Sequence, residues 1–186
     1  MNLLRYYFEI GGEHFDVNAF SDTALKNGLP SGRIRTINNI KLLTNNLTKT
    51  LSMRKIFSGI VGTDCEKYVV WSTPIVNYVA DRELYLANLD LGMTTETAQV
   101  WLKEEIVLLE FLDALKNQLP NIEKYCSSSF FSCLKLIYGY DETDSPGGGH
   151  HYSQSLLKKL SDLSADLSSD SESFELHFLR IKSDQA

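Results

Sequence analysis

Two adjacent histidines, His150 and His151, and a nearby group of carboxylates are the residues best suited to binding a transition metal. The carboxylates are Asp141, Glu142 and Asp144, which stand in a segment with one proline and three glycines. A zinc site needs three or four ligands fixed around one ion. Adjacent histidines on a flexible loop rarely point at the same ion, and the spacing offers no third fixed ligand. We therefore expect no metal and no other cofactor.

A second chemical pair, His14 and Asp16, stands near the start of the chain. An enzyme built on it would need a pocket lined by His14, Asp16 and His177, in which an imidazole and a carboxylate exchange a proton. An Asp directly before a helical segment more often caps that helix by accepting backbone hydrogen bonds. Because no complete catalytic set is evident, we expect that the chain is not an enzyme.

Three cysteines, Cys65, Cys126 and Cys133, have neither CxxC spacing nor the density of a disulfide framework. Cys133 lies in an apolar stretch, where a cysteine acts as a small buried side chain. The first residues lack the pattern of a signal peptide, and no apolar run is long enough to span a membrane. These features predict a cytoplasmic protein that does not enter a membrane.

Charge divides the chain into two unlike parts. The 186 residues include 24 acidic and 18 basic side chains, which gives a formal net charge of −6. Residues 23–63 hold seven basic side chains and no acidic one, so the remainder has 11 basic against 24 acidic residues, a net of −13. The basic segment could contact nucleic-acid phosphates or pair with the acidic surface of the same chain. Its seven cations are Lys26, Arg33, Arg35, Lys41, Lys49, Arg54 and Lys55.

Acidic residues also recur at every fourth position near the end of the chain. On a helix, Asp162, Asp166 and Asp170 would form a ridge beside a stripe of leucines. Such carboxylates either make a helix face soluble or attract a basic partner protein. In the second case the loop carboxylates and a nearby tyrosine would join the ridge. The predicted partner-binding residues are then Asp141, Glu142, Asp144, Tyr152, Asp162, Asp166 and Asp170.

Hydrophobic periodicity and turn residues predict the elements that position these side chains. Strands are predicted over residues 3–10, 53–61, 66–71, 83–89, 130–140 and 174–182. Helices are predicted over residues 16–27, 95–119 and 153–167, and residues 31–52 are left unassigned because their periodicity is weak. Residues 141–149 are expected to form a surface loop.

Two of these helices have clear apolar stripes. The first ends at Pro120, and the second begins after Ser153, a favourable N-cap. Both stripes predict helices packed against a sheet. We therefore expect a single α+β domain over residues 1–186, with a mostly antiparallel sheet that carries both helices on one face. The stripe residues are Trp101, Leu108, Leu112, Leu115 and Leu119 in the first helix, and Leu156, Leu160, Leu163 and Leu167 in the second.

The opening RYYFEIGGEHFD and the closing YSQSLLKKLSDLSADLSSDSESFEL are similar to blocks of a small uncharacterised bacterial domain family. Its members begin with a strand, a glycine and a Phe-Asp turn, and end with a Leu-rich helix and a strand. Some members occur among the immunity proteins of toxin systems. The resemblance implies a cytoplasmic immunity protein that neutralises a cognate toxin domain of the contact-dependent inhibition type, and it implies no catalytic residues. A basic nuclease would suit the acidic chain as the toxin. The alternative is a non-enzymatic nucleic-acid-binding adaptor that uses the basic 26–55 segment.

Overall fold

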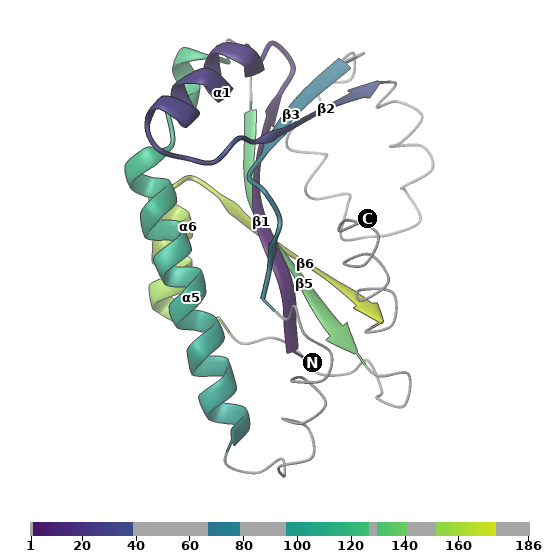
Figure 1. Cartoon of the computed structure of the whole chain (residues 1–186), viewed down its shortest axis with the longest axis vertical. Coiled ribbons are helices and arrows are strands. Elements are labelled where there is room, and N and C mark those ends of the chain that lie inside the picture. The colour runs from purple at the N-terminus through teal and green to yellow at the C-terminus, as the bar shows by residue number, and fades with distance from the viewer. Residues whose placement is uncertain (1, 39–66, 79–95, 127–129, 141–151, 174–186) are drawn as a thin grey trace. The chain divides into compact units, whose positions relative to one another are not determined.

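The computed structural model describes residues 2–38, 67–78, 96–126, 130–140 and 152–173 of the chain (Figure 1). The helices in this part are α1 (Val17–Lys26), α5 (Glu96–Gln118), α6 (Gln154–Asp162) and the short 3-10 helix η1 (Ile122–Lys124). The strands are β1 (Asn2–Gly12), β2 (Arg33–Asn38), β3 (Lys67–Ser72), β4 (Val76–Asn77), β5 (Phe130–Tyr140) and β6 (Asp166–Ser173). No helix among the described residues is long and apolar enough to cross a membrane.

The six strands form one sheet in the order β2-β3-β1-β5-β6, and β4 also pairs with β1. β3 is antiparallel to both of its neighbours, with Ser72 opposite Glu9 on β1 and opposite Arg33 on β2. β4 is antiparallel to β1 as well. In Figure 1 the arrows of β5 and β6 point the same way, as expected for two strands joined by the crossover helix α6. The fold is therefore α+β with a mostly antiparallel sheet, as the sequence predicted.

Contacts between residues divide the chain into two compact units. One unit comprises Met1–Tyr7, Ile75–Asn117 and Leu134–Ala186, and it contains α6 and nearly all of α5. The other comprises Phe8–Pro74 and Gln118–Cys133, and it contains α1, β2 and β3. The boundary between them falls within strands β1 and β5. The prediction of a single domain over residues 1–186 is not tested by this division and stays a prediction.

Aromatic rings hold α1 against β3 in the second unit. The Phe20 ring of α1 meets the Trp71 ring of β3 edge to face, with centroids 5.3 Å apart, and meets the rings of Phe15 and Tyr125 in the same way. Gly32 lies so close to Trp71 that an added Cβ would be 2.0 Å from the indole Nε1. A side chain at this position would thus displace the tryptophan at the centre of the cluster.

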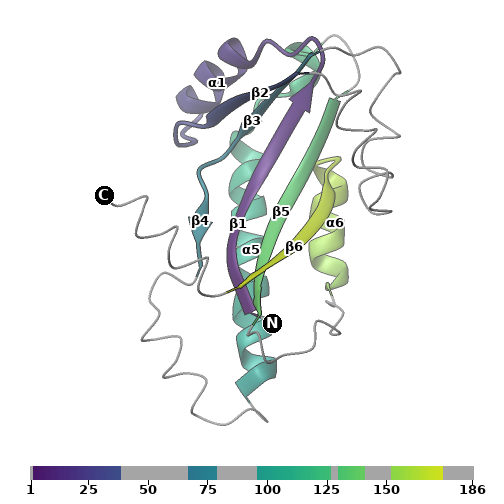
Figure 2. The same ribbon diagram turned by 90° about the vertical axis from the view of Figure 1, so that its right-hand side faces the viewer.

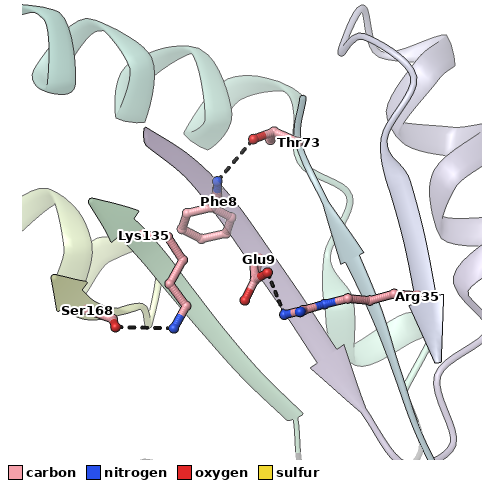
Figure 3. A network of polar contacts seen from close by, with 6 residues as sticks. All are labelled: Phe8, Glu9, Arg35, Thr73, Lys135 and Ser168. Atoms are coloured by element: carbon pink, nitrogen blue, oxygen red, sulfur yellow. Dashed lines mark hydrogen bonds and ion pairs between the residues drawn. The ribbon is translucent and has the colours of Figure 1, made fainter. Parts of the chain in front are cut away.

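The backbone around β3 is tied to β1 at the end of the strand. The N–H of Phe8 donates to the Thr73 hydroxyl at 3.0 Å, and the N–H of Thr73 donates to the Phe8 carbonyl at 2.9 Å (Figure 3). Thr73 is 2% exposed, so both groups need a partner within the protein. The reciprocal bonds therefore fix the position at which β3 stops.

In the first unit, α5 and α6 lie on the same side of β5 and β6 in both views (Figures 1 and 2). The apolar side chains on the inner faces of both helices are buried. The Phe111 ring of α5 packs on the Tyr6 ring of β1, with ring centroids 5.0 Å apart. This confirms the prediction of two main helices on one face. The buried helix residues include Leu108, Leu112, Leu115, Leu156 and Leu160.

Most predicted elements within the described residues are confirmed. β1, β3 and β5 occupy the places of the strands predicted over 3–10, 66–71 and 130–140, and α1 and α5 match the helices predicted over 16–27 and 95–119. β2 arises in the stretch that had been left unassigned. The strands predicted over 53–61, 83–89 and 174–182, and the loop predicted over 141–149, lie outside the described residues.

The helix predicted over 153–167 begins as expected but ends too early. The Ser153 side chain accepts from the N–H of Leu156, which confirms the N-cap. After Asp162 the N–H of Ala165 donates to Leu160 and the N–H of Ser164 donates to Ser161, and Ser164 has a φ of 50°. These are the two bonds and the left-handed residue of a Schellman motif, which stops a helix. The prediction that α6 continues to Leu167 was therefore wrong, and β6 begins at Asp166.

Candidate functional site

The end of α6 separates the three aspartates of the predicted helical ridge. Asp162 is the last residue of α6, whereas Asp166 and Asp170 belong to β6. The ridge along one helix was therefore a wrong prediction. Because side chains alternate along a strand, Asp166 and Asp170 still share one face of β6. The three carboxylates thus lie on two different elements.

Asp162 is engaged by the neighbouring helix. The Lys116 Nζ of α5 lies 2.7 Å from the Asp162 Oδ2, and this hydrogen bond and charge lower the pKa of the Asp162 carboxyl. A second ion pair joins Lys159 of α6 to Asp113 of α5, so the two bonds cross between the same helices in opposite directions. Asp162 therefore helps to hold α6 on α5.

The face of β6 that carries Asp166 and Asp170 also carries Ser168 and Glu172, at every second position. The Lys135 Nζ of β5 donates to the Ser168 hydroxyl at 3.2 Å (Figure 3). Glu172 is 7% exposed, and it forms an ion pair with Arg5 of β1. Two positions of this face are therefore bound by cations from other strands.

The remaining two positions of this face, Asp166 and Asp170, are exposed. No ion pair joins either carboxylate to another residue in the part of the chain that the structure describes. These two carboxylates are thus available to a cation from outside the protein. We call Asp166 and Asp170 the β6 carboxylates.

The other predicted partner-binding residues have different positions. Tyr152 is half-buried just before α6, and its hydroxyl lies near the hydroxyl of Tyr138 on β5. The pKa of the Tyr138 hydroxyl is raised, first by burial and then by Tyr152. The tip of Tyr152 is therefore directed to the sheet. Outside the described residues are Asp141, Glu142, Asp144, His150 and His151.

Asp16, one member of the candidate acid-base pair, forms a hydrogen bond with the backbone of a helix. Its side chain accepts from the N–H of Ala19 at 3.2 Å, as the N-cap of α1. The capping alternative for Asp16 is thus confirmed.

The two described cysteines, Cys126 and Cys133, are both buried, as expected for Cys133. Among the described residues, no three His, Cys, Asp or Glu side chains are grouped to hold a metal ion. His177 lies outside these residues.

The structure describes only three cationic residues of the basic segment. Lys26 lies in the last turn of α1, Arg33 is exposed on β2, and the Arg35 Nη2 of β2 lies 2.7 Å from the Glu9 Oε1 of β1 (Figure 3). The Glu9 side chain is only 4% exposed, whereas that of Arg35 is 57% exposed. At Arg35 the alternative of pairing within the chain is therefore realised. Outside the described residues are Lys41, Lys49, Arg54 and Lys55.

A buried carboxyl that the sequence analysis missed lies in α5. Glu104 is 7% exposed, and its Oε1 accepts from the backbone N–H of Leu3 at 2.9 Å. Burial raises the pKa of this carboxyl to about 7, although the Leu3 N–H opposes the rise. The signal was its position, because Glu104 stands three residues after Trp101 and four before Leu108, within the apolar stripe of the helix.

Comparison with known proteins adds no relative. No known protein family, no curated protein and no solved structure matches this chain. The resemblance to an immunity-protein family therefore stays a prediction.

Proposed function

We propose that the protein is a cytoplasmic immunity protein that binds a basic toxin domain through the β6 carboxylates and blocks its active or substrate-binding surface. The observation that carries this proposal is the exposure of Asp166 and Asp170 on one face of β6, with no ion pair to any described residue. The net charge of −6 supports the same choice of partner, because an acidic protein attracts a basic one during encounter.

The spacing of the β6 carboxylates defines what they can bind. Four residues of strand separate the two Cα atoms by about 13 Å. Lys or Arg side chains at a similar separation on a toxin surface could reach both at once, whereas a single small cation could not. A nuclease holds such cations where nucleic-acid phosphates bind. Carboxylates placed there would compete with the substrate for the same cations.

The remaining predicted residues divide by what they already contact. Asp162 is bound to Lys116, so we assign it to the stability of the protein and not to the partner surface. Tyr152 contacts Tyr138, and its exposed part can contribute only at the rim. The proposed surface includes three further carboxylates on sequence grounds alone, and these are Asp141, Glu142 and Asp144.

Co-expression tests the proposal directly. The protein is produced together with a candidate toxin domain chosen from the coding sequences beside its gene, and the purified material is analysed by size exclusion. A one-to-one complex that survives dilution, with rescue of the cells from growth arrest, is the expected result. Absence of both complex and rescue would reject this partner and the immunity role together.

A second candidate is the nucleic-acid-binding adaptor, which the exposed Arg33 and the half-exposed Arg35 on one face of β2 favour. It predicts that a labelled oligonucleotide binds with an affinity that falls steeply as salt rises. Arg33→Gln together with Arg35→Gln should then weaken binding. The pairing of Arg35 with Glu9 argues for the first proposal, because that cation is already partly neutralised.

A further inference from the structure

Glu104 lies where three segments of the first unit meet. Its carboxyl comes from the buried face of α5 and holds the N–H of Leu3 at the start of β1. Next to Leu3, the carbonyl of Leu4 accepts from the N–H of Tyr78 at 2.8 Å, just after β4. The Glu104 carboxyl therefore fixes the end of β1 to which the β4 segment is also bound.

Weakly acidic groups surround this carboxyl. The hydroxyls of Tyr78 and of Tyr138 on β5 are close enough that the charge of Glu104 raises the pKa of each. The Leu3 N–H lowers the pKa of Glu104, and the positive charge of the chain's amino terminus lowers it further. No cationic side chain in the described ranges forms an ion pair with Glu104. Within the described part of the chain, ionised Glu104 is thus a buried negative charge without an ion-paired side chain.

The two protonation states of Glu104 differ in how well they suit this site. A neutral carboxyl still accepts the Leu3 N–H through its carbonyl oxygen, and its hydroxyl can donate to a phenol oxygen. An ionised carboxyl is a better acceptor but loses its hydration when the site closes. Because burial is the largest effect on the pKa of this carboxyl, desolvation outweighs the hydrogen bond.

We propose that Glu104 is a proton-controlled latch: its neutral carboxyl holds the start of β1 on α5, and its ionisation loosens that contact. The contact between Leu3 and Glu104 is then most stable in mildly acidic solution, and it breaks more often as the solution becomes alkaline. The proposal does not depend on the identity of the partner protein.

The latch is connected to β6 through one strand. Two residues after Leu3, Arg5 of β1 forms the buried ion pair with Glu172 of β6. An opening that frees the N–H of Leu3 also loosens the backbone that positions Arg5. Glu172 shares its face of β6 with the β6 carboxylates. Ionisation of Glu104 should therefore increase the motion of β6 as well as that of β1.

Amide hydrogen exchange of the whole protein, followed by NMR at pH 5.5 and pH 8.5, tests the latch. The protection factor of Leu3, corrected for the intrinsic exchange rate, should fall on the order of 30-fold between these pH values. This follows from linkage between a pKa of about 7 in the closed site and 4.5 in an open, hydrated one. In Glu104→Gln the protection should not depend on pH.

Glu105→Gln is the matched control, because it removes a neighbouring half-buried carboxyl of the same helix. It should keep the pH dependence of the wild type. A wild-type protection factor that does not change with pH would overturn the proposal, as would the same pH dependence in Glu104→Gln. If Glu104→Gln does not fold, the Glu104 carboxyl is titrated by carbon NMR in the wild type. A midpoint near pH 7 is expected there, and one near the ordinary 4.5 would contradict the latch.

Discussion

The Lys116 Nζ lies 2.7 Å from the Asp162 Oδ2, and this ion pair joins α5 to the last residue of α6. Asp162, which the sequence places in a predicted binding ridge, therefore joins two helices of the same protein. The remaining candidates on described elements are Asp166 and Asp170, both on β6. The distinction between Asp162 and these two residues can be tested by separate substitutions.

Asp162→Asn should lower the thermal midpoint slightly at pH 7 and leave partner binding unchanged. Lys116 lowers the pKa of Asp162 below its ordinary 3.8, so the ion pair adds stability above that pH and loses it as the pH falls further. The difference from the wild type, measured by thermal unfolding, should therefore vanish at pH 2 to 3. It should also shrink in high salt. A difference that persists at low pH would show that Asp162 acts in some other way.

Glu104→Gln should change how the global free energy of unfolding depends on pH. Because the folded-state pKa of about 7 exceeds the ordinary 4.5, the folded protein holds a proton that the unfolded chain releases, so wild-type stability is lost as pH rises through this window. The loss amounts to up to about 3 kcal/mol. Urea unfolding at pH 5 and pH 8 should show Glu104→Gln close to the wild type at the lower pH and more stable at the higher. Equal effects at both values would contradict the raised pKa.

Glu172→Gln should strongly destabilise the protein, because it leaves the Arg5 guanidinium buried without its counter-charge. The two side chains are only 10% and 7% exposed, and the Arg5 Nε has no hydrogen-bond partner among the described residues. Breaking one side of a buried ion pair costs about 3 to 5 kcal/mol. The double substitution Arg5→Met with Glu172→Leu should cost less than Glu172→Gln alone. Urea unfolding gives the free energy of unfolding of both variants. A larger loss of stability in the double variant than in Glu172→Gln would contradict this explanation.

Ser164→Gly should stabilise the protein by about 0.5 to 1 kcal/mol. Ser164 has a φ of 50° at the end of α6, a conformation that is strained for serine and unstrained for glycine. Ser164→Ala is the control, because it removes the hydroxyl and keeps the strain. Chemical unfolding should rank the glycine variant first. A glycine variant less stable than wild type would mean that contacts of the serine outweigh its strain.

The elements with long, regular patterns were predictable from the sequence. α5 follows from the leucines that recur every three or four residues before Pro120, and β5 from the apolar run that begins at Phe130. The end of α6 was not predictable, because the leucine spacing continues through Leu163 to Leu167 while the helix stops at a serine in place of the usual glycine. Local backbone hydrogen bonds prevailed over periodicity there.

The candidate site was harder to predict than the helices and strands, because it depends on contacts between residues that are far apart in the sequence. The alternation of Asp166 and Asp170 in β6 preserved their common face by coincidence, since positions four apart share a side in a strand as well as in a helix. The ion pairs of Asp162 with Lys116 and of Arg35 with Glu9 join residues far apart in the chain. Periodicity carries no information about such partners. Glu104, in contrast, could have been found as a carboxylate within an apolar stripe.

The most direct test of the proposed partner surface is calorimetric titration of the protein with a purified toxin domain that co-expression identifies, in 50 mM and 300 mM salt. Asp166→Asn with Asp170→Asn should weaken binding by at least tenfold in low salt and reduce its salt dependence, because charge pairs with the partner are lost. Asp162→Asn is the matched control and should bind as the wild type does. Equal affinity of the double variant and the wild type, with both folded, would contradict the assignment of the β6 carboxylates as the partner surface.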